Sequence, residues 1–332
     1  MQFTRHVGRA RQRIRLLARI TLLVMAPCVF IAACSVDVHD CIPGYLDSEK
    51  NVKLMREARG DDALKIFNAN PELRLLLEKF KPVSISGAAY DYSGITIRLG
   101  IAKFASADEA FGVYSGLTAM PRKRWSTGGG EMSYKNPFVA GFKGVYAFWF
   151  YSPNHPGNYF EFYETTGAKI LKDLRINKRV KVNNCSYTWK LLPEENRFRD
   201  SIVYKKNEDV HGLIIDSAYS ASYLSGKNRS AIYILALPGE TAAKGRFNDY
   251  SLSLKNARIK TQPFPAVFAG NPCQAVSAET GSGILVVYQY RWLIFIVNNA
   301  NNKESAVKHI RNIYIRMLDL KNEFREIETQ RQ

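Results

Sequence analysis

Apolar residues repeat along the chain with two different periods, and each period predicts one kind of element. From residue 95 to residue 101 they alternate with polar or small residues, which is typical of a half-buried strand. From residue 73 to residue 80 they recur every three or four positions, which is typical of an amphipathic helix. Asn70 and Pro71 suit the start of that helix and Pro82 ends it, so we expect a helix over residues 71–80.

The same two periods predict further elements in both halves of the chain. We expect helices near residues 106–114, 166–176 and 240–247 and from about residue 303, and strands over residues 145–151, 231–237, 284–290 and 292–297. The order is similar in the two halves, and Ala110, Gly112 and Tyr114 correspond to Ala243, Gly245 and Phe247. Single helices separated by hairpins favour antiparallel sheets. We therefore predict an α+β fold of two similar units, each an antiparallel sheet packed against helices, with a long C-terminal helix.

Residues 1–33 have the pattern of an export signal. Six arginines and no acidic residue come before an apolar run over residues 20–33, which only Pro27 interrupts. The run is shorter than the roughly 20 residues that span a bilayer. We expect a cleaved signal peptide; the alternatives are an uncleaved anchor or a basic start without function.

The residues that end this run, Ile31-Ala32-Ala33-Cys34, resemble the lipobox of bacterial lipoproteins. The resemblance implies cleavage before Cys34, a diacylglyceryl thioether on its sulfur and acylation of its freed amine. Two or more acyl chains make membrane anchoring stable. The neutral Ser35 that follows implies the outer membrane, with the protein facing the periplasm.

The chain then divides into four segments. We predict a signal peptide over residues 1–33, a lipid-anchored tether over 34–60, a first α+β domain over 61–183 and a second, similar domain over 184–332 that ends in the long helix. The tether is inferred from its polar, mixed composition.

The last helix carries a heptad pattern. Its apolar positions step alternately by four and three residues: Ala306, Ile310, Ile313, Met317, Leu320, Phe324 and Ile327. A helix of about 25 residues would be nearly 40 Å long, more than one small domain spans. The seam either packs within the chain or, beyond Leu320, meets another envelope protein.

The charge balance is basic even without the leader. The whole chain has a net charge of +17, and removing the six leader arginines leaves 41 basic and 30 acidic residues, a net charge of +11. Such a balance suits nucleic acid, anionic lipid or anionic glycan, or serves solubility. Because export argues against nucleic acid, an anionic envelope surface is the expected partner.

The cysteines suit an oxidising compartment. Cys28 lies in the leader and Cys34 takes the lipid, which leaves Cys41, Cys185 and Cys273 for disulfide chemistry. An odd number allows one pair at most. We expect Cys185 to pair with Cys273, because both lie in the folded body. No spacing of cysteines and histidines indicates a metal site or cofactor.

Two motifs carry a resemblance to a known family: Phe104-Ala105-Ser106-Ala107-Asp108-Glu109-Ala110-Phe111-Gly112-Val113-Tyr114-Ser115 and, downstream, Gly144-Val145-Tyr146. They resemble the bacterial family catalogued as domain of unknown function 6599. The similarity is clearest over about residues 85–175. It implies an envelope location and a duplicated α+β body, and it implies no activity.

One basic segment is a candidate ligand site. Arg122, Lys123, Arg124 and Trp125 precede three glycines, and three cations beside an indole could hold a phosphate or sulfate on a glycan or lipid headgroup. The alternative is a solvated turn with Trp125 in the core. The segment lacks the spacing of a nucleotide-binding P-loop.

Other candidates are weaker. The aromatic residues over 153–163 could line a ligand groove or alternate into the core from a strand. The four histidines after the leader form no catalytic or metal-binding pattern, and the carboxylate pairs are adjacent residues whose side chains diverge. We therefore predict no catalytic residue, metal or cofactor.

These observations favour a non-catalytic, lipid-anchored envelope protein that binds an anionic glycan, a lipid headgroup or another envelope protein. The alternatives are a hydrolase of envelope polymers with an interdomain groove, which needs carboxylates or a histidine in that groove, and a structural subunit of a lipoprotein complex.

Overall fold

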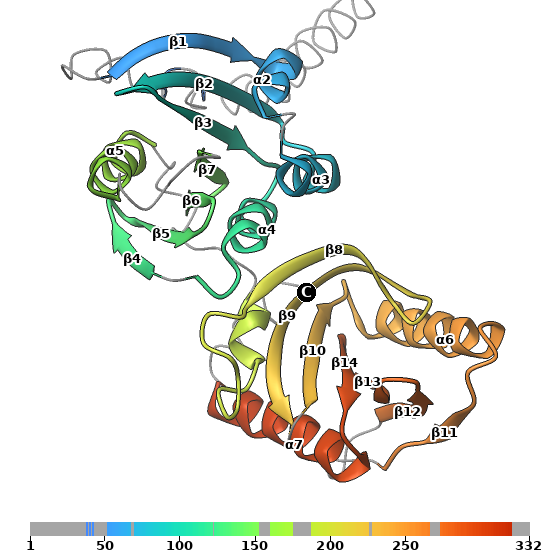
Figure 1. The fold of residues 1–332 in the computed structure, drawn as a ribbon. Helices are drawn as coiled ribbons and strands as arrows, with labels where there is room; N and C mark the ends of the chain where they lie inside the picture. The colour runs from blue at the N-terminus through green and yellow to red at the C-terminus, as the bar shows by residue number, and fades with distance from the viewer. Residues whose placement is uncertain are drawn as a thin grey trace, which may run out of the picture.

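The strands in the described part of the chain form two antiparallel sheets of seven strands each, shown in the computed structural model of Figure 1. The structure describes residues 38, 40, 42, 52–67, 70–121, 123–152, 160–174, 187–225, 228–265 and 273–320. Residues 52–174 form the first unit and residues 187–320 the second.

The first unit contains the sheet with strand order β1-β2-β3-β7-β6-β5-β4. Its strands are β1 (Val52–Arg59), β2 (Ser84–Tyr92), β3 (Ile95–Lys103), β4 (Lys123–Thr127), β5 (Gly130–Lys135), β6 (Phe138–Lys143) and β7 (Tyr146–Tyr151). Its helices are α2 (Gly60–Ile66), α3 (Pro71–Phe80), α4 (Ala107–Thr118) and α5 (Phe160–Asp173).

The second unit contains the sheet with strand order β11-β12-β13-β14-β10-β9-β8. Its strands are β8 (Val203–Val210), β9 (Leu213–Ser225), β10 (Asn228–Ala236), β11 (Thr261–Pro263), β12 (Cys273–Thr280), β13 (Gly283–Tyr290) and β14 (Leu293–Ala300). Its helices are the 3-10 helix η4 (Tyr187–Leu191), α6 (Glu240–Asn256) and α7 (Lys303–Asp319).

The two units share one topology. In each, three antiparallel strands lead into a helix, and four more strands lead into a second helix; the first unit also has α2 and α3 between β1 and β2. By this order β8 corresponds to β1, α6 to α4 and α7 to α5. The sequence match between the two halves falls at the same place in the corresponding helices. Ala110 to Tyr114 occupy the same positions in α4 as Ala243 to Phe247 do in α6. The predicted α+β fold of two similar units is confirmed.

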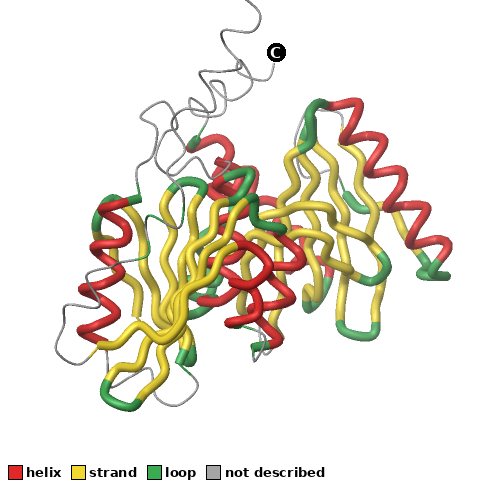
Figure 2. Tube along the Cα trace, turned by 90° about the horizontal axis from the view of Figure 1, so that it is seen from above, coloured by secondary structure: helices red, strands yellow, loops and turns green. Residues whose placement is uncertain are grey.

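Helices cover the sheets on both faces. In the first unit, α5 packs on one face, and α2, α3 and α4 pack on the other. In the second unit, α6 packs on one face, and α7 and η4 pack on the other. Helix α4 contacts β5, β6 and β7 of its own sheet and β8 of the second unit. Figure 2 shows helices lying between the two groups of strands.

Side-chain caps fix the starts of three helices. Asn70 Oδ1 accepts a hydrogen bond from the Leu73 amide (2.8 Å), and Asn302 does the same for Ser305 (2.8 Å). Ser106 Oγ accepts from the Glu109 amide at 3.2 Å. Such caps satisfy amides that the helix itself leaves unpaired. The helix predicted over residues 71–80 is confirmed at both ends.

Three predicted boundaries need correction. Strand β1 lies inside the predicted tether. The sequence pattern did not reveal it, because the strand is ordered by hydrogen bonds to β2 and most of its side chains are exposed at the sheet edge. Helix α5 begins at Phe160, so the aromatic residues there form its first turn and not a strand. Helix α6 continues to Asn256, nine residues past the predicted end, because Tyr250 and Leu254 also face the core.

The heptad seam packs within the chain as far as the structure describes it. Ala306, Ile310 and Ile313 are buried, and Met317 and Leu320 pack against the same core. Helix α7 ends at Asp319, and residues 321–332 lie outside the described residues. Helix α7 has 17 residues, so the longer C-terminal helix that the sequence predicts is not confirmed, and contact with a partner beyond Leu320 stays a prediction.

The duplication provides a matched pair of substitutions. A Cβ added at Gly112 of α4 would lie 2.5 Å from ring carbons of Phe80, whereas one added at Gly245 of α6 meets nothing within 4 Å. We expect Gly112→Ala to lower the free energy of unfolding by about 1–3 kcal/mol through overpacking. We expect Gly245→Ala to raise it by about 0.5–1 kcal/mol, because alanine is the better helix former. Urea denaturation of both variants measures the difference, and equal effects would contradict the packing of α3 on α4.

Candidate functional site

The basic segment singled out in the sequence is the edge strand β4 and not a loop. Arg122 lies outside the described residues, and Lys123–Thr127 pairs with β5. Side chains alternate between the faces of a strand, so Lys123 and Trp125 share one face while Arg124 takes the other. The strand therefore separates residues that we expected to act together.

Arg124 links the two units. Its Nη1 lies 2.9 Å from Oδ1 of Asp200, and its Nε donates a weak hydrogen bond to Ser133 Oγ at 3.4 Å. Its guanidinium also lies 5.9 Å from the centroid of the Tyr114 ring. With these contacts made inside the molecule, Arg124 serves the junction of the units.

Lys123 and Trp125 lie against helix α5. The ring centroids of Trp125 and Phe160 are 5.1 Å apart, and the Lys123 ammonium lies 3.9 Å from the Phe160 centroid. Lys123 Nζ is 3.9 Å from Oε2 of Glu164. Trp125 packs against the apolar core on this face, which agrees with the alternative that its indole belongs to the core.

A different cluster of cations lines a groove at the junction of the units. The groove has a volume of about 280 Å³ and lies where α3 and α4 meet β8, β9 and β10 (Figure 1). This volume is near the lower end of the range for small-molecule sites. The polar residues that line it are Lys79, Ser201, Tyr204, Lys205, Lys206, Ser220, Ser222 and Tyr233. The apolar wall includes Leu76, Phe80, Met120 and Val203.

Carboxylates behind the groove hold its three lysines in place. Lys79 Nζ and Lys205 Nζ each lie 3.2 Å from an oxygen of Glu208, and Lys206 Nζ lies 2.6 Å from Oε1 of Glu109. The lysine side chains keep 28–35% of their surface exposed. They can therefore exchange part of these contacts for a bound anion.

The protonation states suit an anion site. Burial would raise the pKa of Glu208, but the charges of Lys205 and Lys79 outweigh burial and lower it below its ordinary value. Burial, and then the charge of Glu208, raise the pKa of Tyr233 to about 12. The tyrosine hydroxyl, which is hydrogen-bonded to Ser220, therefore remains a donor at neutral pH. At that pH the groove presents ammonium groups and hydroxyls.

Helix α4 positions the wall that belongs to the second unit. Tyr219 donates a hydrogen bond to Asp108 in the first turn of α4, and the adjacent Glu109 holds Lys206. Ser115 Oγ accepts from the Tyr204 amide of edge strand β8 at 3.3 Å. The acidic residues that the sequence presents as a helix start thus also bind the second unit.

The described residues that line this groove include no carboxylate and no histidine. The described part of the chain also holds no group of three or more metal-ligating side chains.

Sequence reasoning missed these lysines. Lys79 and Glu208, which form one of the ion pairs, are 129 residues apart in the chain. Lys79 lies in the last turn of α3, where a cation is ordinary. Nothing in the local pattern distinguishes it or Lys205 from other surface lysines.

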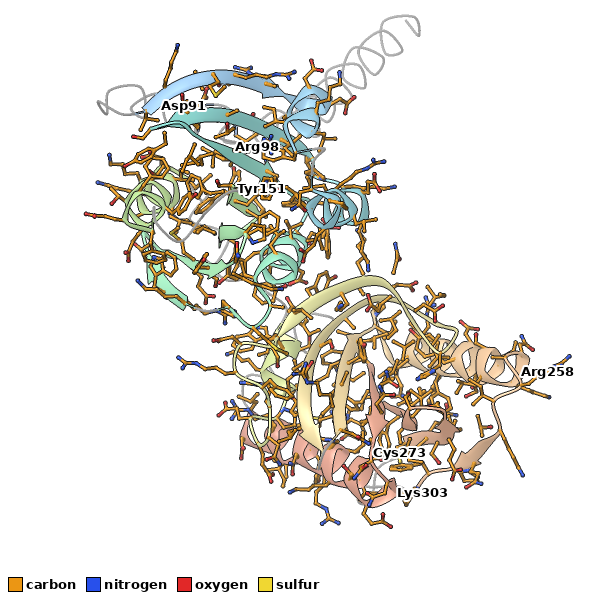
Figure 3. All side chains as sticks on the ribbon, in the orientation of Figure 1. Asp91, Arg98, Tyr151, Arg258, Cys273 and Lys303 are labelled. Carbon is orange, nitrogen blue, oxygen red and sulfur yellow. The ribbon has the colours of Figure 1, made fainter. Side chains whose placement is uncertain are left out.

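The cysteine predictions remain open. Cys34 and Cys185 lie outside the described residues. Cys273, at the start of β12, is half-buried (Figure 3). The lipid on Cys34 and the pairing of Cys185 with Cys273 therefore stay predictions.

Comparisons with protein-family models, with curated proteins and with solved structures give no significant match. The resemblance to the family catalogued as domain of unknown function 6599 accordingly stays a prediction. No helix within the described ranges is long and apolar enough to cross a bilayer.

One histidine contributes to stability and not to the groove. His309 of α7 is buried, with Nε2 3.2 Å from Ser230 Oγ and its ring edge-on to Tyr223. Burial, and then the charge of Lys308, lower the pKa of His309 to about 4.

We therefore expect acid to destabilise the protein through this residue. As pH falls below the unfolded pKa of about 6.5, the unfolded state binds a proton that the folded state takes up only near pH 4. Between pH 7 and pH 4.5 this linkage removes about 2–3 kcal/mol from the free energy of unfolding. The free energy of unfolding of His309→Gln, measured by urea denaturation, should therefore fall by about 2–3 kcal/mol less than that of the parent between pH 7 and pH 4.5. The same pH dependence in both proteins would refute the assignment.

Proposed function

We propose that this protein is a lipid-anchored envelope protein of the outer membrane, and that its two-unit body binds a small acidic sugar in the groove between the units without transforming it. The observation that carries the proposal is the meeting of Lys79 and Lys205 at Glu208, in a groove that Lys206 also lines and whose described lining contains no carboxylate or histidine. The leader and the Ile31–Cys34 motif support the location.

The chemistry of the groove suits an acidic sugar. Lysine ammonium groups recognise a carboxylate, sulfate or phosphate as point charges. Ser220, Ser222 and Tyr233 supply hydroxyls that can pair with those of a sugar. Leu76 and Phe80 provide an apolar wall for the face of a ring. A groove of about 280 Å³ suits a small ligand and not an extended polymer.

Two substitutions in the groove should act in opposite directions. Lys79→Gln removes a cation and should weaken binding of glucuronic acid about tenfold, the usual value of a charged hydrogen bond. Glu208→Gln keeps the shape but releases Lys79 and Lys205 from their competing carboxylate, so binding should tighten by several-fold. Isothermal titration calorimetry with glucuronic acid, glucose 1-phosphate and uncharged glucose measures these changes.

The control is the pair Lys53→Gln and Lys172→Gln, which removes exposed cations of β1 and α5. These variants should bind like the parent. Equal affinity for glucose and glucuronic acid, or a loss of affinity in Glu208→Gln, would contradict the assignment of the groove.

The anchoring part of the proposal has its own test. Cys34→Ala removes the thiol that would carry the diacylglyceryl group, so the chain should keep its leader and take up no labelled palmitate. Metabolic labelling with fractionation of the envelope measures both results. If the parent chain is found soluble, unlabelled and with its leader intact, the location is wrong.

A further inference from the structure

A second basic surface lies at the far end of helix α6. A shallow, open hollow there is lined by three cations, Lys255, Arg258 and Lys260, and by Leu252 and Ile259. Figure 3 shows Arg258 at the outer end of the helix. We call these five residues the basic tip.

The cations of the basic tip are not neutralised within the described part of the chain. None of the three forms an ion pair there, whereas each groove lysine lies within 3.2 Å of a carboxylate. No carboxylate lines the hollow. Three uncompensated charges at one end of the second unit give this surface a positive potential.

The tip also exposes one apolar side chain. The C-terminal end of a helix attracts cations through its dipole, which would account for Lys255 alone. Leu252 is 57% exposed beside these cations, although burial would stabilise it. An exposed leucine among cations suits a surface that lies on an anionic membrane, where the apolar group can enter the interface.

We propose that the basic tip contacts the headgroups of anionic phospholipids and gives the anchored protein a second attachment to a membrane. A bilayer presents a continuous negative surface to a hollow that is too open to enclose a single phosphate. The acidic-sugar groove lies on other elements, so this proposal stands without it.

The test is sedimentation with vesicles of phosphatidylcholine, with or without phosphatidylglycerol. The chain from Ser35 onward is used, because it lacks the lipid anchor but retains every described residue. We expect binding only to vesicles with phosphatidylglycerol, and weaker binding at high salt. Each basic residue near such a surface strengthens binding about fivefold. Changing Lys255, Arg258 and Lys260 to Gln should therefore weaken it roughly 100-fold.

Three further variants separate the effect of the tip from that of net charge and from that of the groove. Changing Lys53, Arg56 and Lys172 to Gln removes the same charge elsewhere and should leave vesicle binding nearly intact. Leu252→Gln keeps all charges and should weaken binding severalfold. Lys79→Gln should bind vesicles like the parent, so failure of the groove leaves this result unchanged.

Three outcomes would overturn the proposal. They are equal binding to both kinds of vesicle, an equal loss in the two triple variants, and full competition by soluble glycerol phosphate, which would indicate a site for a free phosphate. Circular dichroism of each variant verifies that it is folded.

Discussion

The packing of helix α4 between the two sheets is the interaction on which the rest of the structure depends. Its residues Val113 and Tyr114 belong to a core that continues into the second unit through Tyr219 and Ile232. Phe111 lies 6.0 Å from Tyr219 between ring centroids. A helix that is covered on both sides exposes little of its surface, and eight of the 12 residues of α4 are buried.

The corresponding helix shows what α4 would be without the second unit. Only four of the 17 residues of α6 are buried, and all face their own sheet. Gly245 is open to solvent where Gly112 admits the Phe80 ring of α3, a first-unit helix that has no counterpart between β8 and β9. The two copies thus share a topology but differ in surface, because one helix is covered twice and the other once. The outer end of α6 is free to carry the exposed cations of the basic tip.

The junction also explains why the groove lies where it does. Strand β8 is an edge strand, and an uncovered edge offers free amides to other chains. Ser115 of α4 covers part of that edge by accepting from the Tyr204 amide. The equivalent strand β1 of the first unit has no such cover from α4. The helix that closes the junction therefore also brings Lys79 of α3 next to Lys205 and Lys206 of β8.

Local rules determined part of this protein from the sequence alone. The helix over residues 71–80, the strand that begins at Ile95 and the repeated pattern in α4 and α6 depend on caps and periods among near neighbours. Only the tertiary structure made residues 52–59 a strand, because hydrogen bonds to β2 order an edge whose side chains are mostly exposed. It also decided the site. β4 divides the expected cations between two faces, while Lys79 and Glu208, 129 residues apart, meet because α4 packs the first unit against the second.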